Sequence, residues 1–158
     1  MYFIKICYMR NYTLLAVGMA LLCCCTAGGG TADQSGVKEA VAFGNAFFNY
    51  DFEGALTRVT PESERWLRFA ASNVTEQDVE ILNAQQEGAV VEAETVEYSD
   101  DSTLTVVLHV DNYLQKERVG QKGHIAYDGR YRVELVKRNG RYLVRMAGLP
   151  RNERRSRD

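Results

Sequence analysis

The chain has 158 residues, of which 21 are acidic and 19 basic, and it contains 4 cysteines. Its length is enough for one domain with one hydrophobic core, and its small net charge of −2 gives no reason to expect nucleic acid as a partner. Every cysteine lies at or before position 25, so no disulfide framework can hold the rest of the chain together.

The first residues combine a basic start, an apolar run and a cysteine triplet. Lys5 and Arg10 precede the uncharged run 12–22, which is too short to span a membrane and long enough for the core of a signal peptide. The triplet resembles the lipobox of bacterial lipoproteins, where a leucine three positions upstream and a small residue before the cysteine mark cleavage and lipid attachment. Cys25 fits this pattern best and Cys24 next. We therefore expect a lipid anchor in a bacterial cell envelope, on the periplasmic side or in the outer membrane.

Two alternatives stay open for this region. Translation starts at Met1 or at Met9, because Met9 begins a compact signal with its own basic residue. The triplet could also belong to a buried helix or to a metal site. Consecutive cysteines converge poorly on one zinc ion, and no further Cys or His lies near enough to complete four ligands, so no metal site is expected.

Composition also sets the expected boundaries. The stretch after the triplet is small, polar and glycine-rich, which is typical of a flexible tether, and an arginine-rich end follows the last proline. The expected parts are a signal peptide (1–25), a tether (26–36), one domain (37–150) and a basic tail (151–158).

Charge is divided unevenly along the chain. Residues 33–111 contain 16 acids and 4 bases, whereas residues 112–158 contain 5 acids and 13 bases. We expect the two halves to attract each other within the fold. The alternative is a basic surface that faces phosphate-bearing lipid or polysaccharide.

The first part of the domain has the apolar spacing of helices. The pattern over 37–48 predicts one buried helix face, and Asp51 is placed to cap a second, short helix. Thr60-Pro61-Glu62 predicts the start of a third helix that ends near Asn73, and 75–78 predicts the start of a fourth.

The period then changes from helical to alternating. Strands are predicted over 89–98 and 103–113, and Asn139-Gly140 predicts a tight hairpin turn before the last strand. Helices followed by about four antiparallel strands indicate an α+β domain, with the helices packed on one face of a curved sheet. The residues expected on the inner face of the middle strands are Leu104, Val106, Leu108, Val110, Ile125, Tyr127, Tyr131, Val133 and Leu135.

The segment 47–56, followed by 60–63, resembles the opening of small bacterial lipoproteins with the nuclear-transport-factor-2-like (cystatin-like, SnoaL-like) fold. In those proteins a long helix ends in an aromatic-Asp-aromatic elbow, and an Ala-Leu helix and a Thr-Pro-Glu start follow. The resemblance covers residues 37–148 and implies a cone between sheet and helices. Many of these lipoproteins have no assigned activity, and the wider fold includes ketosteroid isomerases, dehydratases and polyketide cyclases, so the fold alone does not decide function.

The residues expected to line this cone are aromatic. A tyrosine with an ordinary pKa of about 10 is a poor proton-transfer group near neutral pH, but it serves well as a hydrogen-bonding wall. No catalytic residue and no cofactor are therefore expected. The candidate lining residues are Phe48, Trp66, Tyr127, Tyr131 and Tyr142.

Three interpretations of function remain. The first is a non-enzymatic binding or accessory lipoprotein, with a pocket for a small apolar ligand. The second is an isomerase-like or dehydratase-like enzyme, for which His109 and Asp111 offer an acid–base pair on one strand face, although we expect that face to point away from the cone. The third is a structural component that forms a homodimer through the outer face of the sheet.

Overall fold

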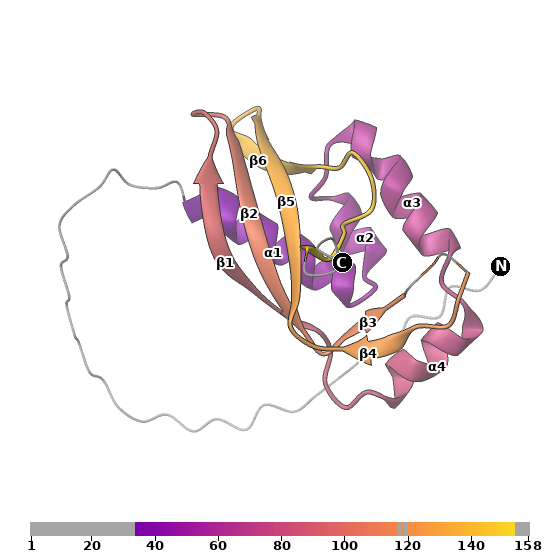
Figure 1. The fold of residues 1–158 in the computed structure, drawn as a ribbon. Coiled ribbons are helices and arrows are strands. Elements are labelled where there is room, and N and C mark those ends of the chain that lie inside the picture. Colours follow the sequence, from indigo (N-terminus) through magenta and orange to yellow (C-terminus); the bar gives the residue numbers. More distant parts are fainter. Residues whose placement is uncertain (1–33, 117, 119, 154–158) are drawn as a thin grey trace, which may run out of the picture. The chain divides into compact units, whose positions relative to one another are not determined.

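The computed structural model describes residues 34–116, 118 and 120–153 (Figure 1). The predicted lipid-attachment residues Cys24 and Cys25 lie outside this part. The first helix begins earlier than expected and includes the last residues assigned to the tether. The helices are α1 (Gln34–Phe48), α2 (Phe52–Leu56), the short 3-10 helix η1 (Pro61–Ser63), α3 (Glu64–Ser72) and α4 (Glu76–Ala84).

The predicted starts of the second and fourth helices are confirmed. The N–H of Gly54 donates to Asp51 Oδ1 at 2.9 Å, so Asp51 caps α2. The hydroxyl of Thr75 and the carboxylate of Asp78 form a complete capping box on α4. Thr60 precedes η1, but its hydroxyl bonds the Ser63 hydroxyl at 2.8 Å instead of a helix N–H.

Four strands form one antiparallel sheet in the order β1-β2-β5-β6, and α1 contacts all four of them. The chain therefore has the predicted α+β architecture, with N-terminal helices packed on a four-stranded antiparallel sheet. The predicted hairpin turn is also confirmed, because Asn139 and Gly140 have φ angles of 52° and 78° between paired strands. The strands are β1 (Val90–Tyr98), β2 (Thr103–Asp111), β3 (Tyr113–Gln115), β4 (His124–Ala126), β5 (Gly129–Arg138) and β6 (Arg141–Arg145).

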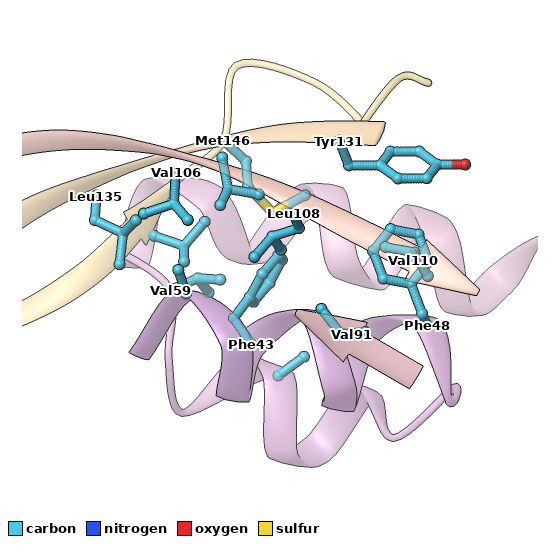
Figure 2. Packing of buried hydrophobic residues seen from close by; sticks show 14 of the residues in the cluster. Phe43, Phe48, Val59, Val91, Val106, Leu108, Val110, Tyr131, Leu135 and Met146 are labelled. Carbon is cyan, nitrogen blue, oxygen red and sulfur yellow. The ribbon is translucent and has the colours of Figure 1, made fainter. Parts of the chain in front are cut away.

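The predicted inner face of β2 is confirmed. Leu104, Val106, Leu108 and Val110 are all fully buried, and they pack with Phe43 of α1 in the core (Figure 2). Thr105 and His109 on the other face are half-exposed, as the two-residue period of a strand predicts, whereas Val107 on that face is also buried. Burial of these side chains is the main force that holds the helices on the sheet.

The paired strands β2 and β5 bend sharply where the sequence predicts them to continue. Asn112 and Asp128 have left-handed φ angles of 53° and 58°, and beyond them the chain resumes as the separate pair β3–β4. The N–H of Asp128 donates to Asp111 Oδ1 at 2.6 Å and links the two bends. The prediction that Tyr127 faces the core is wrong, because the bend interrupts the alternation and leaves Tyr127 67% exposed.

The acidic and basic halves of the chain meet in ion pairs. Arg130 Nη2 lies 2.5 Å from Glu94 Oε1, and Arg132 Nη1 lies 3.2 Å from Glu97 Oε2. These contacts confirm that the two halves attract each other within the fold. Within the described residues, no helix is both long and apolar enough to cross a membrane.

Candidate functional site

A cavity of about 410 Å³ lies between the end of α1, the helices α2 and α3, strand β3 and the segment 149–152. This volume is in the range of pockets that hold small organic molecules. The described residues that line it include no aspartate, glutamate or histidine. Its apolar walls come from Phe47, Phe48, Phe52, Val74, Leu114 and Leu149.

Two of the predicted lining residues form one wall of this cavity. Phe48 at the end of α1 and Tyr131 of β5 both line it, and their ring centroids lie 4.6 Å apart (Figure 2). Behind them Tyr113 packs edge-on against both rings, at 5.7 Å from Phe48 and 5.6 Å from Tyr131. Edge-to-face packing holds aromatic rings in a defined orientation, so this wall is rigid.

The structure places the other three candidates elsewhere. Trp66 packs against the core from α3, under the guanidinium of Arg65, and its indole Nε1 is buried without a hydrogen-bond partner in the described residues. Tyr142 of β6 is buried in the core beside α1, where it packs closely on Gly36. Tyr127 is exposed at the bend, so none of the three lines the cavity.

Tyr50 lines the cavity from an unusual backbone position. It follows α1 with φ 62°, and its N–H donates to the carbonyl of Phe47 while the N–H of Asp51 donates to that of Ala46. This is the Schellman arrangement that ends a helix, in which glycine is usual at the left-handed position. A tyrosine there costs backbone energy, of order 1 kcal/mol, and such exceptions cluster at functional sites. The exception places an aromatic ring and a hydroxyl at the cavity.

The hydroxyl of Tyr50 stays protonated over the ordinary pH range. Burial, and then the nearby Asp78 carboxylate, raise the pKa of Tyr50 to about 12. A neutral phenol can donate one hydrogen bond to a ligand, but it cannot act as a base near neutral pH.

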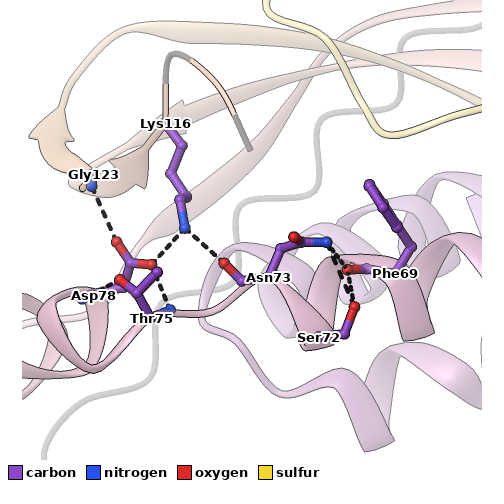
Figure 3. Close-up of polar contacts among 7 residues, drawn as sticks. All are labelled: Phe69, Ser72, Asn73, Thr75, Asp78, Lys116 and Gly123. Carbon is purple, nitrogen blue, oxygen red and sulfur yellow. Dashed lines mark hydrogen bonds and ion pairs between the residues drawn. The ribbon is translucent and has the colours of Figure 1, made fainter. Parts of the chain in front are cut away.

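A buried ion pair supports the floor of the cavity (Figure 3). Lys116 Nζ lies 2.5 Å from Asp78 Oδ2 and donates to the carbonyl of Asn73 at 2.8 Å. Asp78 is fully buried, and it also accepts from the N–H groups of Thr75 at 2.8 Å and Gly123 at 3.0 Å. Lys116 is thus committed to joining α3, α4 and the chain after β3.

These contacts decide the charge of Asp78. Burial by itself raises the pKa of Asp78, but hydrogen bonds from Lys116, Thr75 and Gly123 outweigh it and lower the pKa to about 2. The carboxylate is therefore ionised and fully engaged, which makes it a structural group and leaves no free acid at the cavity.

The segment 149–152 closes the cavity along the edge of β5. β6 pairs only with the second half of β5, and Asn152 forms a bridge with Tyr131 on the free first half. Asn152 Oδ1 accepts from the N–H of Arg130 at 3.3 Å, and its Nδ2 donates to the Tyr113 hydroxyl at 3.1 Å. The first residues assigned to the basic tail are therefore part of the wall.

Two further cations reach the cavity. Arg118, in the loop after β3, and Arg151, in the closing segment, both line it. Within the described part of the chain, neither guanidinium has a hydrogen-bond or ion-pair partner. In this they differ from Lys116, whose charge Asp78 cancels.

The histidine pair expected for an enzyme lies away from the cavity. His109 Nε2 is 3.2 Å from Asp128 Oδ1 and 3.8 Å from Asp111 Oδ2, at a half-buried position on the outer face of the sheet. His124 of β4 is exposed and does not line the cavity either. In the described residues no group of three or more His, Cys, Asp and Glu side chains could hold a metal ion.

Several lining residues were not predicted from the sequence. Tyr50 was assigned only to the elbow after the first helix, although an aromatic residue at a helix end is a signal in its own right. Arg118 and Leu114 are not predicted to line a cavity, because the bend at Asn112 that changes the course of the chain before them is not predicted from the sequence. An Asp-Asn step inside an alternating strand is the signal that could have indicated this bend.

Comparison with the known protein families finds no match for the chain. None of the curated proteins matches it either. Function must therefore be argued from the site itself.

Proposed function

We propose that the protein is a lipid-anchored envelope module that binds a small, largely apolar molecule without converting it. The observation that carries this proposal is the cavity between α1, α3 and β3, which is walled by aromatic and aliphatic side chains. An apolar pocket with a few polar groups is the usual form of a small-molecule site. Its described lining offers neither an acid nor a histidine for proton transfer.

The enzyme and dimer interpretations have less support. An isomerase or dehydratase needs a base within reach of its substrate, whereas the His109 pair lies on the outer face. The homodimer through that outer face stays a prediction. The nuclear-transport-factor-2-like resemblance favours a binding site between helices and sheet, which is where the cavity lies.

The anchor rests on the cysteine triplet, which lies outside the described residues. Two or more acyl chains would hold the protein stably, because each buried methylene contributes about 0.8 kcal/mol. Replacing Cys24 and Cys25 together by Ala is expected to release the protein into the soluble fraction. Unchanged retention in the membrane fraction would contradict the anchor.

Binding can be tested with a matched pair of variants on α3. Ala70 lines the cavity, and the next residue, Ala71, is exposed and does not. The full lipidated chain in nanodiscs is screened with small neutral aromatic compounds, and thermal unfolding is followed by differential scanning calorimetry. A ligand at saturation is expected to raise the unfolding midpoint by several degrees in the parent and in Ala71→Trp, but not in Ala70→Trp, whose indole fills the cavity.

Two results would contradict this proposal. One is the absence of any stabilising compound for the parent chain. The other is an equal response from Ala70→Trp, which would place binding elsewhere on the molecule.

A further inference from the structure

The lining of the cavity carries charge of one sign only. Lys116, Arg118 and Arg151 reach it, and its described lining contains no carboxylate. Asp78 lies 2.5 Å from Lys116 and cancels that charge within the protein framework. Among the described residues no carboxylate pairs with the guanidinium groups of Arg118 and Arg151, and both line a cavity whose other walls are largely apolar.

Arginine is suited to recognising anions at such a place. Its planar guanidinium presents donors that match a carboxylate or phosphate, and it stays charged at every ordinary pH. The two arginines enter from different parts of the chain, Arg118 from the loop after β3 and Arg151 from the segment beside β5. An anion bound in the cavity could thus be contacted by arginines from two separate segments of the chain.

One neutral donor in the same lining, the Tyr50 hydroxyl, fits this arrangement. The Tyr50 hydroxyl is kept protonated, and the side chain of Asn73 is turned toward α3, where its Nδ2 donates to the carbonyl of Phe69 at 2.7 Å. Tyr50 thus remains available as a donor, while Asn73 is occupied in holding the helix end. The cationic and donor groups of this lining favour a negatively charged or acceptor group over a positive one.

We propose that the ligand is an amphipathic anion, in which an apolar body fills the cavity and a carboxylate or phosphate group pairs with Arg118 and Arg151. This inference rests on the proposed binding function and adds the charge of the ligand to it. The cavity volume of about 410 Å³ lies in the range of small-molecule pockets, so a naphthalene ring with one small substituent is a suitable probe.

The test compares ligands that share one apolar body. 2-Naphthalenemethanol, 2-naphthoate and 2-naphthyl phosphate are measured by equilibrium dialysis against the full chain in nanodiscs, with empty nanodiscs as the blank. At low salt the better of the two anions is expected to bind about fivefold tighter than the alcohol, since partly exposed ion pairs each contribute modestly. The preference is expected to shrink in 0.15 M salt, where exposed charges are screened.

Two double variants of equal net charge assign the preference to its residues. Arg118→Gln/Arg151→Gln is expected to bind the alcohol as the parent does and to lose the preference for anions. Arg68→Gln/Arg138→Gln removes two exposed arginines that pair with Glu64 and Glu62 outside the cavity, and it is expected to keep the preference.

The outcomes distinguish the proposed negative charge of the ligand from the proposed function of binding a small molecule. Binding of the alcohol without any preference for an anion would overturn the inference and leave the binding function standing, as would a preference that survives in Arg118→Gln/Arg151→Gln. Failure of all three compounds to bind would count against both. The order of the two anions shows whether the partner group is a carboxylate or a phosphate.

Discussion

The arginines of the outer sheet face and those of the cavity come from the same basic half of the chain, but they have different surroundings. Arg132 lies between Glu97 at 3.2 Å and Glu153 at 2.7 Å, so its charge is cancelled on the surface. Arg118 and Arg151 face no carboxylate among the described residues. Exposed ion pairs add little stability, about 0–1 kcal/mol each. The difference that matters here is that the charge of Arg132 is matched on the sheet surface, whereas the described residues offer no carboxylate to the two arginines of the cavity.

The largest loss of stability is expected in β2, where one face of the strand is buried and the other lies on the outside of the sheet. Leu108 is fully buried against the helices, and Thr105 lies on the outer face. Leu108→Ala is expected to lower the free energy of unfolding by about 2–5 kcal/mol, because it leaves a void in the core. Thr105→Ala is expected to change it by less than about 0.5 kcal/mol. Chemical denaturation measures both, and equal losses would show that the strand register is wrong.

The next largest effect is expected at the ion pair below the cavity. Asp78→Asn leaves Lys116 without a counter-charge in a mostly buried position, and it is expected to lower the free energy of unfolding by about 3 kcal/mol. Glu97→Gln breaks an exposed pair with Arg132, and a loss below about 1 kcal/mol is expected. Denaturation curves that give the two variants similar losses would remove the distinction between buried and surface pairs.

In the unmodified chain, the same ion pair is expected to make the free energy of unfolding depend on pH in the acid range. The pKa of Asp78 is about 2 in the folded state and near 3.8 without its contacts, so its contribution is present above pH 4 and is lost as pH falls toward 2. The shift corresponds to about 2 kcal/mol. Unfolding free energies measured between pH 6 and pH 2 are expected to fall more steeply for the parent than for Asp78→Asn. Identical slopes would mean that Asp78 has an ordinary pKa.

The smallest change in stability is expected at Tyr50, together with a clear change in binding. Tyr50→Gly relieves a left-handed tyrosine but removes its packing against Phe52, so the unfolding free energy should stay within about 1 kcal/mol of the parent. Ligand affinity should fall severalfold, because the ring lines the cavity. Asn139→Gly, at another left-handed position far from the cavity lining, is the control and should bind normally. Unchanged binding by Tyr50→Gly would exclude Tyr50 from the site.

Local signals predicted most of the fold. The capping residues Asp51 and Thr75, the Asn139-Gly140 turn and the alternation of 103–110 each depend on neighbours in sequence, and each is confirmed. Periodicity also predicted that the helices would cover one face of the sheet. These features follow from backbone geometry and from burial of one face, which a sequence records directly.

The site was harder to predict because it depends on contacts between distant segments. Phe48 and Tyr131 lie on faces that point inward, and both line the cavity. Trp66 was also expected there, but the packing of α3 on the core turns it away. The closing segment could not be foreseen, because Asn152 bonds to Arg130 and Tyr113 through tertiary contacts alone.

Gly129, at the start of β5, has a consequence for how this pocket can evolve. A Cβ atom at this position would lie 2.6 Å from the Tyr113 hydroxyl oxygen and 2.8 Å from the nearest ring carbons, so even alanine would force that ring to move. Tyr113 packs against both Phe48 and Tyr131, and a shift of its ring would carry into the wall of the cavity. Glycine and alanine codons differ by a single base. The shape of the cavity is therefore one mutational step from change, at a residue that does not line it.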